Sequence, residues 1–115
     1  MENQKERLEK LKKKMETAKT IVEQLQEVAE IDGELTVEET RLINSIAMNV
    51  NEFYNLVEAA MADNTITDEE LEEIHVYEKR IIQEASSEAF KDGKISPEER
   101  ALLTKLIFIM ETMEE

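Results

Sequence analysis

The chain has 115 residues, of which 41% are hydrophobic and 37% are charged, and it contains no Cys, one His and two Gly. This length is typical of a single domain, the apolar fraction is sufficient for a core, and the lack of Cys excludes disulfides, thiolate metal sites and thiol nucleophiles. With 28 acidic and 14 basic side chains the net charge is -14, which disfavours binding to nucleic acids or anionic lipid surfaces and suits a basic protein partner or divalent cations.

The first predicted helix covers residues 4–30, and its beginning is basic although the chain is acidic. Residues 1–19 carry seven basic and four acidic side chains, whereas the remaining residues carry 7 basic and 24 acidic ones. Apolar residues recur at alternating intervals of three and four, the spacing of a heptad seam: Leu8, Leu11, Met15, Ala18, Val22, Leu25 and Ala29. We therefore divide the chain into a Lys-rich start, residues 1–20, which protrudes, frays or pairs with a second copy, and an acidic helical domain, residues 21–115.

The second and third predicted helices cover residues 37–62 and 68–90. The second has a complete apolar stripe, which consists of Ile43, Ile46, Val50, Phe53, Val57 and Ala60. The third has a poorer stripe, which consists of Leu71, Ile74, Ile81, Ala85 and Ala89. No segment shows a sustained period of two, so the sequence predicts an all-α protein: a four-helix bundle-like single domain built from repeated helix–turn–helix units.

The fourth predicted helix covers residues 97–113 and is apolar on nearly every side. Such a helix lies at the centre of a core or is covered by another subunit, and we expect it to be the hub of this core. It supplies Ile107, Phe108 and Ile109 as candidate interaction residues. The seam of the first helix supplies Leu8, Leu11 and Met15. Together they predict a homodimer or a complex with a protein partner.

The junctions between the predicted helices are three similar segments, residues 32–39, 63–70 and 92–99, which begin 31 and 29 residues apart. Each contains a candidate N-cap hydroxyl followed three residues later by Glu, which is the pattern of a capping box. The hydroxyl and carboxylate pairs are Thr36 with Glu39, Thr67 with Glu70 and Ser96 with Glu99. Before them stand Gly33, Asn64 and Gly93, residues that tolerate the left-handed conformation at which helices end.

The same segments resemble the second half of an EF-hand loop, with its turn Gly, its aliphatic residue and its final Glu. In that family loop positions 1 and 3 also supply oxygen ligands. Here these positions are held by Val28 and Glu30, by Ala59 and Met61, and by Glu88 and Phe90. Because hard cations need six or more oxygens, tight EF-hand binding of Ca²⁺ is not expected, and a weaker shared site at the acidic turns remains an alternative.

Residues 60–70 and 89–99 also resemble the TerB-like (tellurite-resistance) helical domains, in which Ala-x-Ala-Asp-Gly-x-Ile-Ser/Thr-x-x-Glu precedes an apolar helix. That family is associated with intracellular stress responses, membrane-linked complexes and acidic metal-binding clusters. The resemblance implies a divalent-cation site of the Ca²⁺ type. Its candidate ligands are Asp32, Asp63, Asp92, Glu39, Glu70 and Glu99, for which capping is the competing role.

A weaker motif is Glu72 with His75, the Glu-x-x-His spacing of di-iron bundles. Those sites need two such motifs and two further Glu, so a dimer would have to double the single His and add a residue such as Glu52 or Glu58. An ordinary surface His explains the same residue.

The expected function is that of a non-enzymatic acidic interaction or scaffold protein without a resident cofactor. The alternative is the divalent-cation module, and a third reading is a nucleic-acid mimic whose acidic surface fills the basic groove of a target. We expect no direct nucleic-acid binding. The longest apolar run is residues 106–110 and no secretory signal is visible, so we expect a cytoplasmic protein without a membrane span.

Overall fold

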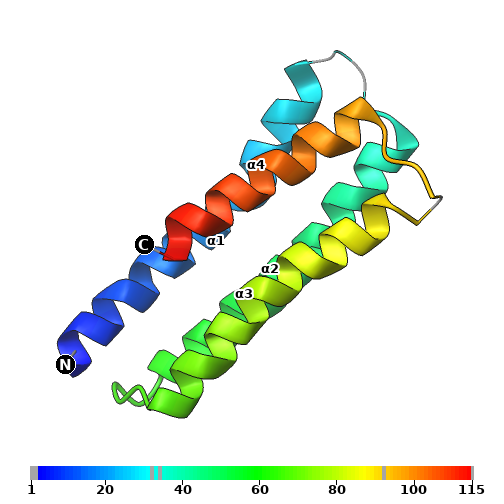
Figure 1. Cartoon of the computed structure of the whole chain (residues 1–115). Coiled ribbons are helices and arrows are strands. Elements are labelled where there is room, and N and C mark those ends of the chain that lie inside the picture. Colours follow the sequence, from blue (N-terminus) through cyan, green and yellow to red (C-terminus); the bar gives the residue numbers. More distant parts are fainter. Residues whose placement is uncertain (1–2, 32, 34, 92, 115) are drawn as a thin grey trace.

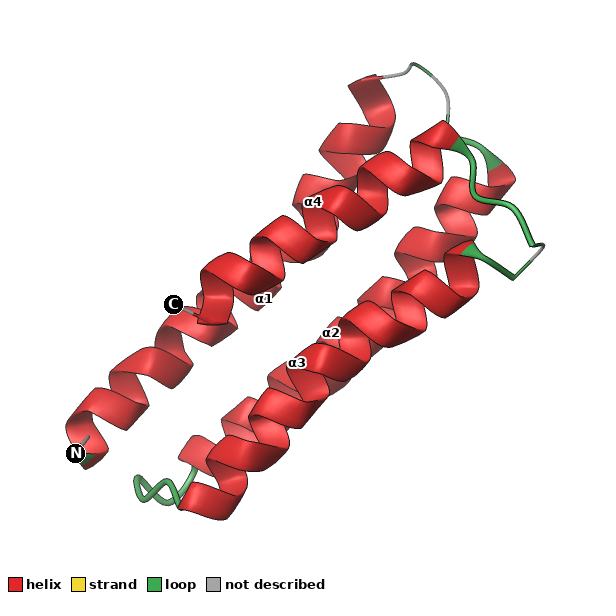
Figure 2. Cartoon of the chain, viewed as in Figure 1, coloured by secondary structure: helices red, strands yellow, loops and turns green. Residues whose placement is uncertain are grey.

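The computed structural model describes residues 3–31, 33, 35–91 and 93–114, and this part of the chain forms α-helices and no strand (Figure 2). The helices are α1 (Gln4–Ile31), α2 (Val37–Met61), α3 (Asp68–Ala89) and α4 (Pro97–Glu114). The predicted all-α class is therefore confirmed. Every helix begins at the expected residue and ends within one residue of the expected position. The starts of α2, α3 and α4 could be placed because each has a capping box next to it.

The helices form an elongated bundle, 45 × 25 × 21 Å, in which α1 and α4 lie side by side and α2 and α3 lie side by side (Figure 1). The largest fully buried side chains come from all four helices and the α2–α3 turn: Phe53, Leu11, Ile21, Leu25, Leu42, Ile46, Ile66, Ile74, Ile81, Leu102, Leu106 and Met110. Both α2 and α4 contact each of the other three helices. The expectation that α4 alone is the hub is therefore only half right, since α2 shares that position.

The turns lie at the two ends of the bundle. The α1–α2 and α3–α4 turns lie at one end, and the α2–α3 turn lies at the other (Figure 1). Each turn contains a described residue with a positive φ, which is 102° at Gly33, 60° at Asn64 and 78° at Gly93. These are the positions at which the sequence predicts the left-handed conformation.

The Lys-rich start of α1 lies against the bundle rather than protruding from it. Leu11 is completely buried, and Leu8 and Met15 pack against the core. The Arg7 guanidinium donates to the Ile66 carbonyl at 2.8 Å and to Asp68 Oδ1 at 2.6 Å, which attaches this end of α1 to the α2–α3 turn. The heptad seam is thus occupied within a single chain.

The basic side chains of α1 cross the bundle near the point where α4 ends. α4 has 18 residues and α1 has 28, so α4 ends alongside the middle of α1 (Figure 1). There the Lys14 ammonium lies 2.5 Å from Oε1 of the buried Glu78 on α3 and 3.4 Å from the Met113 carbonyl of α4. The positive charge of α1 therefore neutralises an acidic residue inside the bundle.

Candidate functional site

The capping glutamates are the first candidate site residues, and each forms a capping box. Glu39 Oε1, Glu70 Oε1 and Glu99 Oε1 accept hydrogen bonds from the backbone N–H groups of the N-cap residues, at 3.1, 2.9 and 3.3 Å. In return each glutamate N–H donates to the N-cap hydroxyl at 3.0 to 3.1 Å. One carboxylate oxygen of each residue is therefore used to finish a helix.

The aspartates of the same turns are poorly placed to form a metal site together with these glutamates. Asp63 Oδ1 accepts a hydrogen bond from the Thr65 N–H at 3.1 Å, which closes a local turn. Asp32 and Asp92 lie outside the described residues. Asp63 and Glu70 lie at the opposite end of the bundle from Glu39 and Glu99, and the 25 residues of α2 between these ends span about 37 Å.

These positions do not bring the acidic turns together into one shared site. In the part of the chain that the structure describes, no group of three or more His, Asp and Glu side chains is arranged to hold a metal ion. Glu72 and His75 are both exposed on α3. Glu52, named as a possible fourth carboxylate, instead accepts a hydrogen bond from the Tyr77 hydroxyl at 2.5 Å.

A polar network around Tyr77 joins the exposed sides of α2 and α3. Burial and the bond to Glu52 raise the pKa of Tyr77 to about 12. The Arg80 guanidinium lies 5.6 Å from the Tyr77 ring centroid and donates to Glu84 Oε1 at 2.8 Å, and this hydrogen bond lowers the pKa of Glu84. The network fixes α2 against α3.

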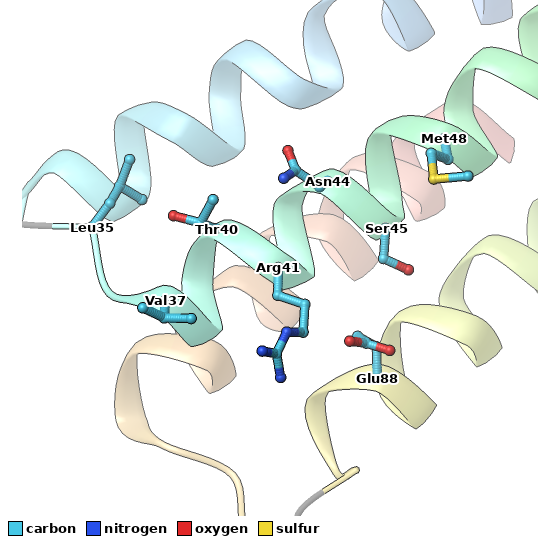
Figure 3. Close-up of a pocket in the computed structure, with 8 residues that line it drawn as sticks. All are labelled: Leu35, Val37, Thr40, Arg41, Asn44, Ser45, Met48 and Glu88. Atoms are coloured by element: carbon cyan, nitrogen blue, oxygen red, sulfur yellow. The ribbon is translucent and has the colours of Figure 1, made fainter.

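An open, largely apolar depression runs along α2, and we call it the α2 groove. It has a volume of about 550 Å³ and is lined by Leu35, Val37, Thr40, Arg41, Asn44, Ser45, Met48 and Glu88. Figure 3 shows Leu35 in the turn at one end, Met48 at the other, and Arg41 extending toward the side on which Glu88 of α3 lies. Val37 is 69% exposed and Met48 is 70% exposed.

This groove was not predicted from the sequence, because the prediction of buried residues followed only the apolar stripes of the helices. Met110 and Met113 are buried, but Met48 falls two positions after the core residue Ile46 and two before the core residue Val50. On a helix a shift of two residues turns a side chain by about 200°, so Met48 must face outward. The sequence does indicate an exposed apolar residue here, because Met48 falls outside the apolar stripe of α2.

A second depression, the α4 groove, lies on the outer side of α4. Its volume is about 620 Å³, and its lining residues are Val28, Pro97, Arg100, Ala101, Thr104, Lys105 and Phe108. Phe108 is 62% exposed, and the Lys105 ammonium lies 5.6 Å from its ring centroid.

The six predicted interaction residues differ in their exposure in the structure. Phe108 and Ile107 lie on the surface, with 62% and 36% exposure. Ile109 and Leu11 belong to the core, and Leu8 and Met15 are partly buried against it. Our expectation that all six are available to a partner is therefore corrected to the two exposed residues of α4.

Charge is distributed unevenly between the two layers of helices. Residues 37–89, which include α2 and α3, carry 13 acidic and three basic side chains. α1 carries seven basic and six acidic side chains, and residues 100–110 of α4 carry only Arg100 and Lys105. The α2–α3 layer is strongly negative, whereas the α1–α4 layer is close to neutral.

Among the described residues, no helix combines the length and the apolar character that crossing a membrane requires. Comparison with known proteins found no family model, no curated protein and no solved structure that matches this chain.

Proposed function

We propose that this protein is a non-enzymatic interaction module that holds a segment of a partner protein in the α2 groove. The observation that carries the proposal is the exposure of Val37 and Met48. Both are about 70% exposed, and both line the same open apolar depression. Most large apolar side chains of the described chain are buried, so two that share one exposed groove favour an interaction site.

The spacing of the groove residues suits an elongated occupant. Val37 and Met48 are 11 residues apart, so they lie on the same side of α2, separated by about 16 Å along its axis. Leu35 extends the apolar line into the α1–α2 turn. A helical or extended segment with two or three apolar side chains matches this length.

The charges around the groove favour a basic partner. The α2–α3 layer that contains it has a large excess of acidic side chains, and a field of this sign increases the rate at which a basic segment associates. Within the groove Arg41 and Glu88 provide one charge of each sign, which would orient the occupant. The polar side chains of the lining include no His and no Cys, which supports a binding role rather than catalysis.

The alternative is the divalent-cation module implied by the TerB-like resemblance of residues 60–70 and 89–99. It has less support, because Glu39, Glu70 and Glu99 each use a carboxylate oxygen for capping. Calorimetric titration with Ca²⁺ distinguishes the two functions. A binding heat together with a raised melting temperature would favour the cation module.

Site-specific photo-crosslinking in the source cell tests the interaction module. We expect a photoreactive amino acid at Met48 to give an adduct of one defined mass. Asn55 is the matched control position, because it is exposed on the same side of α2 but outside the groove. The Val37→Asp substitution should remove the adduct, since it places a charge in the groove while an acidic residue in the first turn of α2 leaves the helix stable.

Equal labelling from Met48 and Asn55, or an adduct that persists in Val37→Asp, would contradict the proposal. An undiminished yield of the adduct when a lysate is irradiated at about 0.5 M salt would argue against an electrostatic contribution, because salt screens exposed charges at that concentration.

A further inference from the structure

The outer face of α4 carries an uncharged strip in a highly charged protein. Pro97, Ala101, Thr104 and Phe108 are exposed and follow one another at intervals of four, three and four residues. They therefore form one line along the helix, directly opposite the buried residues Leu102, Leu106, Ile109 and Met113. The large aromatic ring of Phe108 stands at one end of the strip, and small side chains lie at the other.

One flank of the strip carries a positive charge near its beginning and a negative charge near its end. Arg100 and Glu111 are both exposed, and they are 11 residues apart. This spacing places them within about 20° of each other around the helix and about 16 Å apart along it. A surface with this order of charges is complementary to itself only when the second copy runs in the opposite direction.

We propose that a second copy of this chain docks on the outer face of α4, with the two α4 helices antiparallel about a twofold axis near Thr104 and Lys105. This symmetry brings Arg100 of each protomer to the level of Glu111 of the other, so that two equivalent ion pairs close one side of the interface. It also brings each Phe108 beside the short Thr104 side chain of the other copy, where there is space for the ring.

The charge distribution of the whole molecule favours this face over the others. An approach through α2 and α3 would bring together two layers that each carry 13 acidic and three basic side chains. An approach through α4 keeps these layers on the outside, at the largest distance from each other. Because the α2 groove lies in the outer layers, the dimer and the proposed partner site do not compete, and each can fail without the other.

The opposite flank of the strip predicts an unfavourable contact. Lys105 lies on the α1 side of α4 and close to the twofold axis, so the two Lys105 side chains approach each other. Neutralising Lys105 should therefore strengthen the dimer, most clearly at low salt. If the α4 groove instead held an acidic segment of another protein, the same substitution would weaken binding.

Charge-reversal variants of the full chain test the antiparallel arrangement by sedimentation equilibrium. The Arg100→Glu and Glu111→Arg variants should each raise the dimer dissociation constant by about tenfold or more, because each places like charges in contact at two points. The double variant should restore dimerisation, since both ion pairs are then re-formed with reversed sign. An equimolar mixture of the two single variants should form heterodimers, in which one ion pair has the natural sign and the other is reversed.

Cysteine crosslinking gives an independent measurement, because the natural chain contains no Cys. Thr104→Cys should form a disulfide-linked dimer on mild oxidation, whereas Asn55→Cys on the exposed side of α2 should remain monomeric. Both positions are exposed, and circular dichroism verifies that the variants fold.

A wild-type chain that remains monomeric at about 100 µM would overturn the inference, because the dissociation constant of a specific dimer should lie below this concentration. Single charge reversals without effect, or equal crosslinking through positions 104 and 55, would overturn the antiparallel geometry. None of these outcomes affects crosslinking from Met48, so failure of the dimer is distinguishable from failure of the proposed function.

Discussion

At the level of single residues, the pair formed by Lys14 and Glu78 is the most constrained contact. Glu78 is 1% exposed, and its carboxylate lies 2.5 Å from the Lys14 ammonium. A buried carboxylate is tolerated only when its charge is compensated, because the interior solvates ions poorly. The pair also links α1 to α3, the two helices that have no direct backbone contact.

We expect Lys14→Met to lower the free energy of unfolding by about 2 kcal/mol, because the buried Glu78 carboxylate loses the charged hydrogen bond from this ammonium. The double variant Lys14→Met/Glu78→Leu should recover most of this loss, since the buried carboxylate at position 78 is then removed together with the ammonium. Urea denaturation followed by circular dichroism measures both. Lys12→Met is the control, because it removes the same charge from an exposed neighbouring position and should change stability little.

The raised pKa of Tyr77 predicts that the stability of the protein depends on pH in alkaline solution. Its pKa is raised to about 12 in the folded protein from an ordinary value of 10.0. The unfolded chain therefore loses this proton first as the pH rises. The contribution of Tyr77 to stability is complete below pH 10 and is lost as the pH rises toward 12.

Ultraviolet titration of the phenolate in a Tyr54→Phe background measures this pKa, because Tyr77 is then the only tyrosine. Adding Glu52→Gln should lower the pH of the titration midpoint, since it removes the carboxylate that accepts a hydrogen bond from the Tyr77 hydroxyl. An unchanged midpoint in a chain that is still folded would show that Glu52 does not hold the hydroxyl.

At the level of helices, the ends are set by local chemistry. A capping box involves residues three positions apart, and the left-handed residues Gly33, Asn64 and Gly93 precede the caps by three residues in every turn. Such signals can be read from the sequence without knowing how the helices pack. This explains why the starts of α2, α3 and α4 were predicted correctly.

Removal of one helix cap should lower the stability of the protein by a small amount. We expect Thr67→Ala to lower the free energy of unfolding by about 1 kcal/mol, because the Glu70 N–H loses its hydroxyl acceptor. Thr65→Ala is the matched control, since that residue is exposed in the same turn and its backbone N–H, rather than its side chain, makes the hydrogen bond to Asp63. Thermal unfolding of the two variants should differ, and equal effects would contradict a capping role.

The features that the sequence did not predict depend on distances between helices. Arg7 meets Asp68, and Lys14 meets Glu78, across 61 and 64 residues of chain, so no local pattern indicates these pairs. For the same reason the three acidic turns could be expected to share a site until the α2–α3 turn was found at the opposite end of the bundle from the other two. Ile109 and Phe108 are neighbours in the sequence, yet only the direction of packing decides which of them is buried.

At the level of the whole molecule, the net charge of -14 opposes compaction, and the repulsion is concentrated in the α2–α3 layer. Exposed charges are screened by salt, whereas the buried Glu78 pair is screened much less. Stability should therefore rise with ionic strength.

We expect the melting temperature to increase by about 5 °C between low salt and about 0.5 M NaCl, as screening reduces the repulsion within the acidic layer. Glu72→Gln/Glu73→Gln should reduce this increase, because it removes two exposed acidic charges from α3. Differential scanning calorimetry measures the difference. A melting temperature that falls with salt would show that exposed ion pairs outweigh the repulsion.

The attachment of α1 to both acidic helices has a consequence for biosynthesis. α2 and α3 repel each other as an isolated hairpin, and Arg7 and Lys14 supply the cations that meet α3. Because α1 leaves the ribosome before α3, the basic side chains that pair with α3 are already present when this acidic helix emerges. A circularly permuted chain in which α1 is synthesised last would lose this advantage and should refold more slowly than the natural order.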